Sequence, residues 1–107
     1  MLARAEGLTV ADLGEEWYRW TGLPFVWALW LGREEFITPP LVEALLRARQ
    51  WGLEHIEQVV RHESERLRAG EELVRHYLRD IMQYDMTPAH EEGLARFAEE
   101  CQRLELV

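Results

Sequence analysis

The stretch FVWALWL, residues 25–31, decides the fold that the sequence predicts. Every position in it is apolar, so both alternating faces of an extended chain would be buried, which is typical of a strand inside a parallel sheet. A shorter apolar run at residues 8–13 predicts a second strand. Two strands do not make a stable sheet, because at least three strands or a covering partner are normally needed. We therefore expect an α/β fold of which this chain is one part.

The residues between the two predicted strands form a short helix and a turn. Acidic residues at the start of 15–20 suit the positive end of a helix dipole, and Gly22 and Pro24 end the helix. Asp12 lies at the end of the strand predicted at 8–13, where open α/β sheets place ligands. Capping of the following helix explains an aspartate at this position equally well. The turn 21–24 offers a hydroxyl and backbone N–H groups that could hold a carboxylate. From the residues alone it is only a turn.

The chain after Pro39-Pro40 predicts three or four helices. Apolar residues recur at helical spacing over 41–62, where Gly52 marks a kink or a junction, and again over 69–83. A further helix begins at Thr87-Pro88, although His90 stands where a capping box would have Glu. We expect residues 1–38 to belong to an α/β lobe with a crossover strand and 39–107 to be helical, together forming a single incomplete domain unit.

Composition narrows the classes of partner. The 107 residues carry 20 acidic and 12 basic side chains, a net charge of -8, which argues against nucleic acid. The lone cysteine, Cys101, lies in an apolar helical row, which indicates a buried thiol and a reducing compartment. Residues 1–7 do not resemble a signal peptide, and the apolar run at 23–31 is too short to span a bilayer. We expect a cytoplasmic protein that does not bind membranes.

The sequence contains two histidine-glutamate pairs and a cluster of tryptophans that could mark binding sites. His62-Glu63 and His90-Glu91 each begin like the zinc-protease helix motif, but Arg66 and Leu94 replace its second histidine. We therefore predict no metal and no cofactor. The cluster of Trp17, Trp20, Trp27 and Trp30 could stack on an unsaturated ring or simply form core, and both interpretations remain open.

Residues 12–30, DLGEEWYRWTGLPFVWALW, resemble the signature of the chorismate dehydratases of menaquinone biosynthesis. Their Asp-Leu-Gly, Trp and Thr-Gly-Leu-Pro-Phe-Val elements carry the resemblance. The helical part is similar to the C-terminus of the same family at His76-Tyr77-Leu78, Tyr84-Asp85, Gly93-Leu94 and Phe97. Together these stretches cover nearly the whole chain.

The resemblance implies a type 2 periplasmic-binding-protein-like fold, with two α/β lobes around a cleft. It also implies a carbon–oxygen hydro-lyase that converts chorismate to 3-enolpyruvylbenzoate and water in the futalosine route, without a cofactor. Phe25-Val26 favours this enzyme over a related one that handles cyclic dehypoxanthine futalosine. The substrate-binding residues that we carry over are Asp12, Thr21, Gly22, Leu23, Pro24 and Phe25, and no catalytic base is assigned.

Family members are longer, so we expect this chain to be a C-terminal portion that needs the rest for catalysis. Unpaired sheet edges, or the absent lobe, would offer surfaces for self-association. Two other functions stay open. The same fold serves non-catalytic solute-binding proteins, and the stripe of Leu73, Tyr77 and Ile81 could serve a small helical interaction domain.

Overall fold

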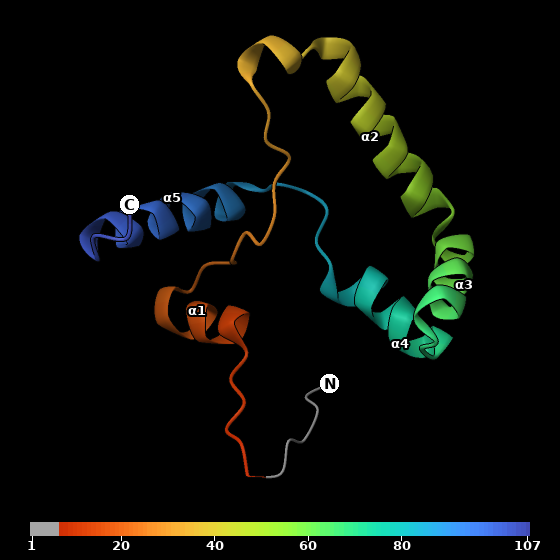
Figure 1. Cartoon of the computed structure of the whole chain (residues 1–107), viewed down its shortest axis with the longest axis horizontal. Coiled ribbons are helices and arrows are strands. Elements are labelled where there is room, and N and C mark those ends of the chain that lie inside the picture. The colour runs from red at the N-terminus through yellow and green to blue at the C-terminus, as the bar shows by residue number, and fades with distance from the viewer. Residues whose placement is uncertain (1–6) are drawn as a thin grey trace. The chain divides into compact units, whose positions relative to one another are not determined.

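The computed structural model describes residues 7–107 and is built from helices (Figure 1). The signal-peptide prediction falls mainly on residues 1–6, outside the described part. The elements, in chain order, are α1 (Leu13–Thr21), the 3-10 helix η1 (Glu34–Phe36), α2 (Pro39–Glu54), α3 (Ile56–Leu67), α4 (Glu71–His76), the π-helix η2 (Tyr77–Ile81) and α5 (Pro88–Arg103).

The two predicted strands are wrong, and so is the α/β class, because residues 7–107 contain no strand. The run 25–31 is extended but unpaired, with Trp30 85% and Leu31 90% exposed. A strand needs a neighbour to satisfy its N–H and C=O groups, and the described chain supplies none. Leu13, expected to end the first strand, instead begins α1 because Asp12 caps the helix there. The two-lobed fold implied by the resemblance is therefore not seen in this chain.

The chain forms two compact units. The first unit combines the residues up to Leu29 with Met86–Val107 and contains α1 and α5. The second unit is the continuous segment Trp30–Asp85, which contains α2, α3 and α4. The division of the whole protein at residue 38 stays a prediction.

The end of α1 and the start of α5 lie at residues that the sequence marked. Gly22 ends α1 in the left-handed region, at φ 71°, and its N–H donates to the carbonyl of Tyr18 at 2.8 Å. Thr87 and Pro88 start α5 as predicted. The capping box, which lacks the usual Glu, is closed by histidine, since the Thr87 N–H donates to Nδ1 of His90 at 3.2 Å. A ring nitrogen thus does the work of the usual carboxylate.

In the second unit the helical stretch 41–62 is divided at His55, which follows Gly52 by three residues. The His55 imidazole stacks on the Trp51 indole, with ring centroids 4.4 Å apart and planes at 13°, and its Nδ1 lies 2.8 Å from the Trp51 carbonyl oxygen. These contacts hold the break between α2 and α3. Further along, α4 passes directly into η2, where the Met82 N–H donates to the Tyr77 carbonyl at 3.0 Å.

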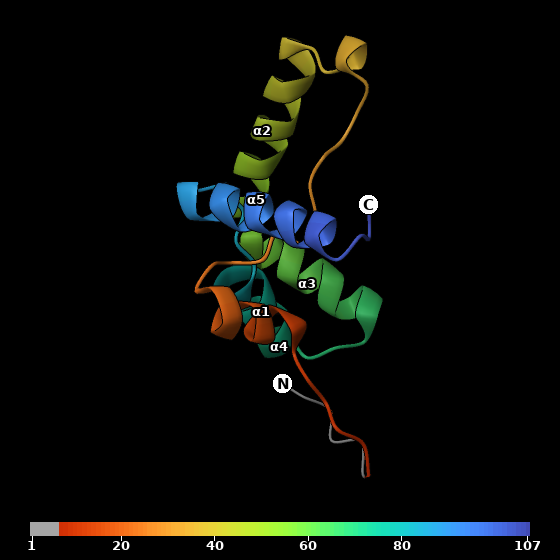
Figure 2. The same ribbon diagram turned by 90° about the vertical axis from the view of Figure 1, so that its left-hand side faces the viewer.

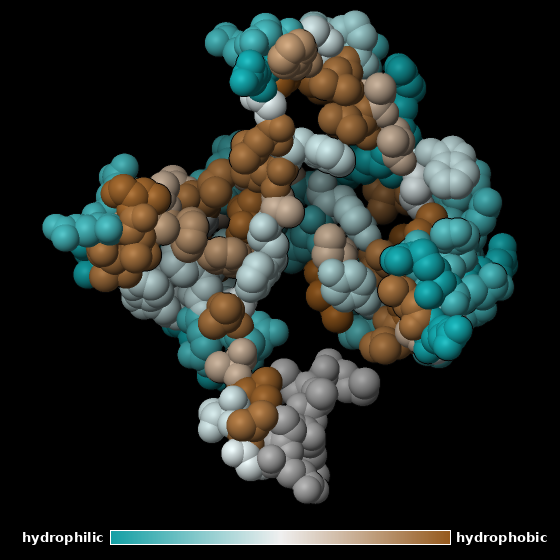
Figure 3. Space-filling view, in the orientation of Figure 1, coloured by the Kyte–Doolittle hydropathy of each residue, from teal (hydrophilic) through white to brown (hydrophobic). Residues whose placement is uncertain are grey.

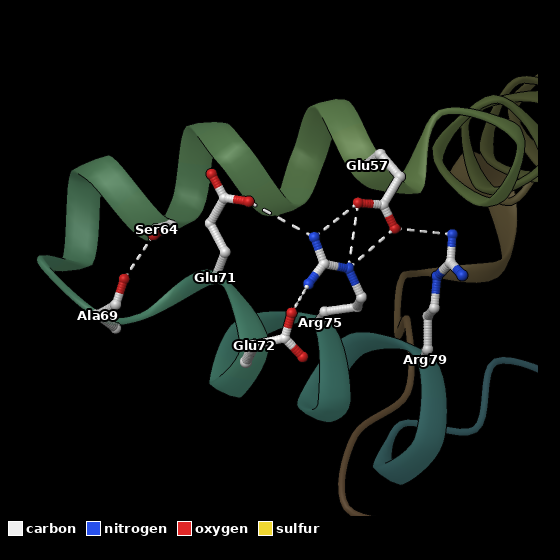
Figure 4. A network of polar contacts seen from close by, with 7 residues as sticks. All are labelled: Glu57, Ser64, Ala69, Glu71, Glu72, Arg75 and Arg79. Carbon is white, nitrogen blue, oxygen red and sulfur yellow. Dashed lines mark hydrogen bonds and ion pairs between the residues drawn. The ribbon is translucent and has the colours of Figure 1, made fainter.

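Arg75 joins α4 to α3 through one carboxylate (Figure 4). Its Nη2 donates to Glu57 Oε2 at 2.9 Å and its Nη1 donates to Glu72 at 2.8 Å, while Arg79 reaches the other Glu57 oxygen at 2.8 Å. Val60 of α3 and Val74 of α4 are the buried hydrophobic side chains of this unit among the described residues. A forked guanidinium on a carboxylate adds a directional contact between these two helices.

The α3–α4 pair is expected to lose stability as the pH falls. The hydrogen bond from Arg75 holds the pKa of Glu57 below its ordinary value of 4.5, so folding favours the ionised carboxylate. A lowered pKa contributes stability that is fully present above the unfolded-state value and is lost as the pH falls through the folded-state value. Far-UV circular dichroism during urea unfolding should therefore show Arg75→Met less stable than the parent at neutral pH, with the difference shrinking below about pH 4.5.

Arg47→Met is the matched control for that titration. Arg47 pairs with Glu43, within α2, at 3.6 Å, and both side chains are exposed. Its removal should leave the acid dependence of unfolding unchanged. A parent and an Arg75→Met variant that lose stability in parallel from neutral to acid pH would show that the Glu57 pair contributes nothing.

Many large hydrophobic side chains of both units are exposed (Figure 3). They include Trp30 and Leu31 after the first unit, and Leu41, Val42, Leu46 and Trp51 along α2. Against this exposure, the buried hydrophobic residues in the described chain are Trp17, Val60 and Val74. No helix within residues 7–107 is both long enough and apolar enough to cross a membrane.

Candidate functional site

Asp12 lies at the N-terminus of α1, outside the helix, and caps it. Its Oδ1 accepts the Glu15 N–H at 2.9 Å, and its backbone carbonyl accepts the Glu16 N–H at 3.0 Å. Two residues on, a Cβ at Gly14 would lie 3.2 Å from the indole of Trp27. In the Asp-Leu-Gly element, Asp12 therefore caps the helix, and Gly14, which has no side chain, lets the Trp27 indole pack closely against the helix. Contact between Asp12 and a substrate stays a prediction.

The turn that follows α1 is held by its own hydrogen bonds. The Thr21 hydroxyl donates to the Trp17 carbonyl at 2.8 Å and accepts the Leu23 N–H at 3.1 Å. With the Gly22 N–H bound to Tyr18, the polar groups proposed as a carboxylate cradle have partners within the turn. A ligand at Thr21, Gly22 or Leu23 would have to share or replace these bonds, and their role as substrate contacts stays a prediction.

Helix α5 packs against the turn and lies beside α1 in both ribbon views (Figures 1 and 2). Gly93 is buried, and a Cβ there would lie well under 3.0 Å from the Pro24 carbonyl oxygen, closer than real Cβ atoms approach. One turn later, the Phe97 ring lies 5.1 Å from the Phe25 ring at 85°. Gly93 gives the space and Phe97 the contact that bring Pro24 and Phe25 against the helix.

An open pocket of about 450 Å³ lies beside this turn, within the first unit. Its lining residues are mostly aromatic: Leu13, Glu16, Trp17, Trp20, Phe25, Trp27 and Phe97. This volume falls in the range of small-molecule sites, which are mainly apolar with a few polar groups. Of the six substrate-binding residues that the sequence predicts, Phe25 lines the pocket, and Asp12, Thr21, Gly22, Leu23 and Pro24 are not among its lining residues.

The rings of the pocket meet edge to face. Trp17 lies at the centre, only 7% exposed, with its ring 5.5 Å from Trp20 at 84°, 5.6 Å from Phe25 at 78° and 6.0 Å from Phe97 at 73°. Such T-shaped pairs are favourable because the positive ring edge meets the negative face. The tryptophans therefore differ in the two interpretations left open for them, core packing and ring stacking. Trp17 is core, whereas Trp20 and Trp27 are largely exposed at the pocket.

Two charged groups lie at the pocket. Glu16 lines it and accepts a hydrogen bond from Arg19 at 2.9 Å. Arg96 of α5 lies over Trp20, with its guanidinium carbon 5.6 Å from the ring centroid, and its Nε donates to Glu100 at 2.9 Å. Glu100 also accepts from Arg103 at 2.7 Å, and Arg103 and Arg96 hold the pKa of Glu100 below its usual range.

Sequence reasoning missed the contributions of Glu16, Phe97 and Arg96. The helix dipole accounts for the pair Glu15-Glu16 at the start of the helix, although Glu16 follows Leu13 by three positions and so shares its helix face. Phe97 and Arg96 are distant in sequence from the turn, and nothing local to them indicates a site. Only the packing of Gly93 on Pro24 brings them to it.

The capping role of Asp12 gives a direct prediction. Asp12→Ala is expected to lower the free energy of unfolding of the first unit by about 1 kcal/mol, because an orphan N–H at the start of α1 loses its acceptor. Asp12→Asn keeps an acceptor oxygen and should stay close to the parent. Thermal unfolding followed by near-UV circular dichroism measures both. Equal losses in the two variants would mean that the charge, and not the cap, matters.

The comparisons with known proteins agree with these motifs. A family described as menaquinone biosynthesis matches residues 1–103. The chain belongs to this family. A chorismate dehydratase from Thermus thermophilus is 41% identical over 91 residues, which make up 84% of this chain and 33% of that protein. The family resemblance read from Asp12–Trp30 is thus confirmed, and the chain spans about a third of the length of the relative it matches. No solved structure matches it.

Proposed function

We propose that the chain contributes to a chorismate dehydratase of menaquinone biosynthesis, a carbon–oxygen hydro-lyase that forms 3-enolpyruvylbenzoate and water. The observation that carries this proposal is the 41% identity to the Thermus thermophilus enzyme over 84% of the chain. The helical ends and close approaches at Asp12, Gly14, Gly22 and Gly93 support it, because they give physical reasons for the shared motifs. A cytoplasmic location is part of the proposal.

Dehydration of chorismate yields an aromatic ring, so the enzyme mainly has to orient the substrate while a ring proton and a hydroxyl leave. The aromatic walls beside Phe25 suit a flat unsaturated ring. The turn 21–24 would contribute neutral hydrogen-bonding groups, which do not repel a dianion. No residue is assigned as the base, since Glu16, the carboxylate among the lining residues, would repel a doubly negative substrate.

The experiment follows chorismate by mass spectrometry, watching for a product lighter by one water. The chain is assayed alone, and again joined to the part of the Thermus thermophilus dehydratase that it does not match. Turnover by the joined protein but not by the upstream part alone supports the proposal. A joined, folded protein that neither binds nor dehydrates chorismate overturns it, and binding without turnover would favour the solute-binding alternative.

A second candidate, the helical interaction domain, is favoured by one observation. Leu73, Tyr77 and Ile81 are each about half exposed along α4 and η2. In this function the stripe would meet an amphipathic partner helix. Light scattering of the parent and of Tyr77→Glu tests for self-association through the stripe. A monomeric parent that captures chorismate would discard this candidate.

A further inference from the structure

The pocket of the first unit has aromatic walls, and an arginine side chain lies over one of them. Trp20 lines the pocket, and the guanidinium of Arg96 lies over its ring. The chain as a whole carries a charge of -8, so an anionic ligand needs a local positive group to overcome the surrounding repulsion. Arg19, the other arginine near the lining residues, is held by both Glu15 and Glu16.

Arg96 retains hydrogen-bonding capacity. Within the part of the chain that the structure describes, only its Nε makes a hydrogen bond, to Glu100, while Glu100 is shared with Arg103. The two terminal nitrogens of Arg96 form no hydrogen bond to a described residue, and 38% of the side chain is exposed. Two parallel N–H groups of an arginine match the two oxygens of a carboxylate.

We propose that Arg96 binds the carboxylate of a monocyclic unsaturated acid whose ring lies against Trp20 and Phe25. This assignment rests on the proposed function, and names the residue that recognises an acid group of the substrate. The ring would exchange contact with water for contact with aromatic walls, and the carboxylate would reach the guanidinium that lies over Trp20. A neutral ring of the same shape would keep the contact with the aromatic walls and lose the contact between carboxylate and guanidinium.

The test uses benzoate as the probe and benzamide as its neutral counterpart, with binding to the full chain followed by tryptophan fluorescence and confirmed by calorimetry. Arg96→Gln should weaken benzoate binding about tenfold or more, because a charge-assisted bidentate contact is lost, and should leave benzamide binding unchanged. Arg96→Lys should recover part of the loss, since it restores the charge but not the fork.

Arg103→Gln is the matched control. It removes the same charge from the same helix and the same ion pair with Glu100, but within residues 7–107 Arg96, and not Arg103, lies over a pocket ring. Benzoate affinity within about twofold of the parent is expected for it. Equal weakening in the Arg96 and Arg103 variants would reduce the effect to net charge and overturn the assignment, as would a parent chain that binds benzoate and benzamide alike.

The same variants separate this assignment from the proposed function. In the joined protein, Arg96→Gln should raise KM for chorismate with little change in kcat. Turnover that is indifferent to Arg96→Gln would overturn the assignment and leave the dehydratase function standing. Arg96-dependent benzoate binding in a joined protein that cannot dehydrate chorismate would retain the assignment and remove the proposed function.

Discussion

Gly93→Ala is expected to destabilise the first unit by about 1–3 kcal/mol, although alanine is the better helix former. The added Cβ would overlap the carbonyl oxygen of Pro24, which is backbone and cannot rotate away as a side chain could. Either α5 or the turn must shift, and the contact between Phe97 and Phe25 shifts with it. Urea unfolding followed by near-UV circular dichroism, which reports on the packed indoles, measures the loss.

Gly52→Ala is the matched control, because it makes the same change inside a helix where nothing lies within 4 Å of the new Cβ. It should stabilise α2 by about 0.5–1 kcal/mol through helix propensity alone. The two substitutions should therefore have opposite signs. A stabilising Gly93→Ala would mean that α5 does not pack on the turn as described.

Trp17→Ala is expected to cost about 3–5 kcal/mol, the range for removing a large aromatic side chain from a core. Trp17 is the buried hydrophobic residue of the first unit among those described, and it contacts Trp20, Phe25 and Phe97. Such a loss is large against the stability of a small unit. We expect the near-UV signal to collapse while helical far-UV signal from the second unit persists.

Trp30→Ala and Trp17→Phe are the control variants for Trp17→Ala. Trp30 is highly exposed, so its removal should change stability by less than about 0.5 kcal/mol. Trp17→Phe keeps a buried ring and removes an indole N–H that has no hydrogen-bond partner among the described residues, so it should cost less than alanine. A Trp17→Ala variant as stable as Trp30→Ala would contradict the aromatic core.

Local chemistry explains which elements were predictable. Asp12, Gly22, Thr87 and Pro88 act on backbone within a few residues, so the end of α1 and the start of α5 followed from sequence. The start of α1 did not, because the apolar run at 8–13 was interpreted as a strand and Leu13 belongs to the helix. The closure of the box by His90 was missed because histidine is a rare substitute for glutamate there. The break at His55 depends on stacking with Trp51, a contact that residue spacing alone does not indicate.

The strand prediction for 25–31 is wrong because a continuous apolar run does not show that a neighbouring strand is present to pair with it. A strand forms only where a neighbour takes its backbone hydrogen bonds, and residues 7–107 offer no such neighbour. Phe25 and Trp27 are instead drawn into an aromatic cluster, with their rings 4.7 Å apart. The pocket was equally beyond sequence reasoning, since Phe97 reaches it only through the docking of Gly93 on Pro24.

The first unit is discontinuous along the chain, and this affects the order of folding and the tolerance to insertion. The Phe25 ring can contact Trp17 and Trp27 early, but its contact with Phe97 forms only after α5 has been synthesised. Trp30–Asp85 is continuous and can fold as it emerges. The segment Trp30–Asp85 connects the two parts of the first unit, as a long loop would. Doubling the length of a flexible loop costs only about 0.6 kcal/mol in closure entropy. Residues added between α2 and α3, far from the pocket in sequence, should therefore leave the aromatic cluster intact.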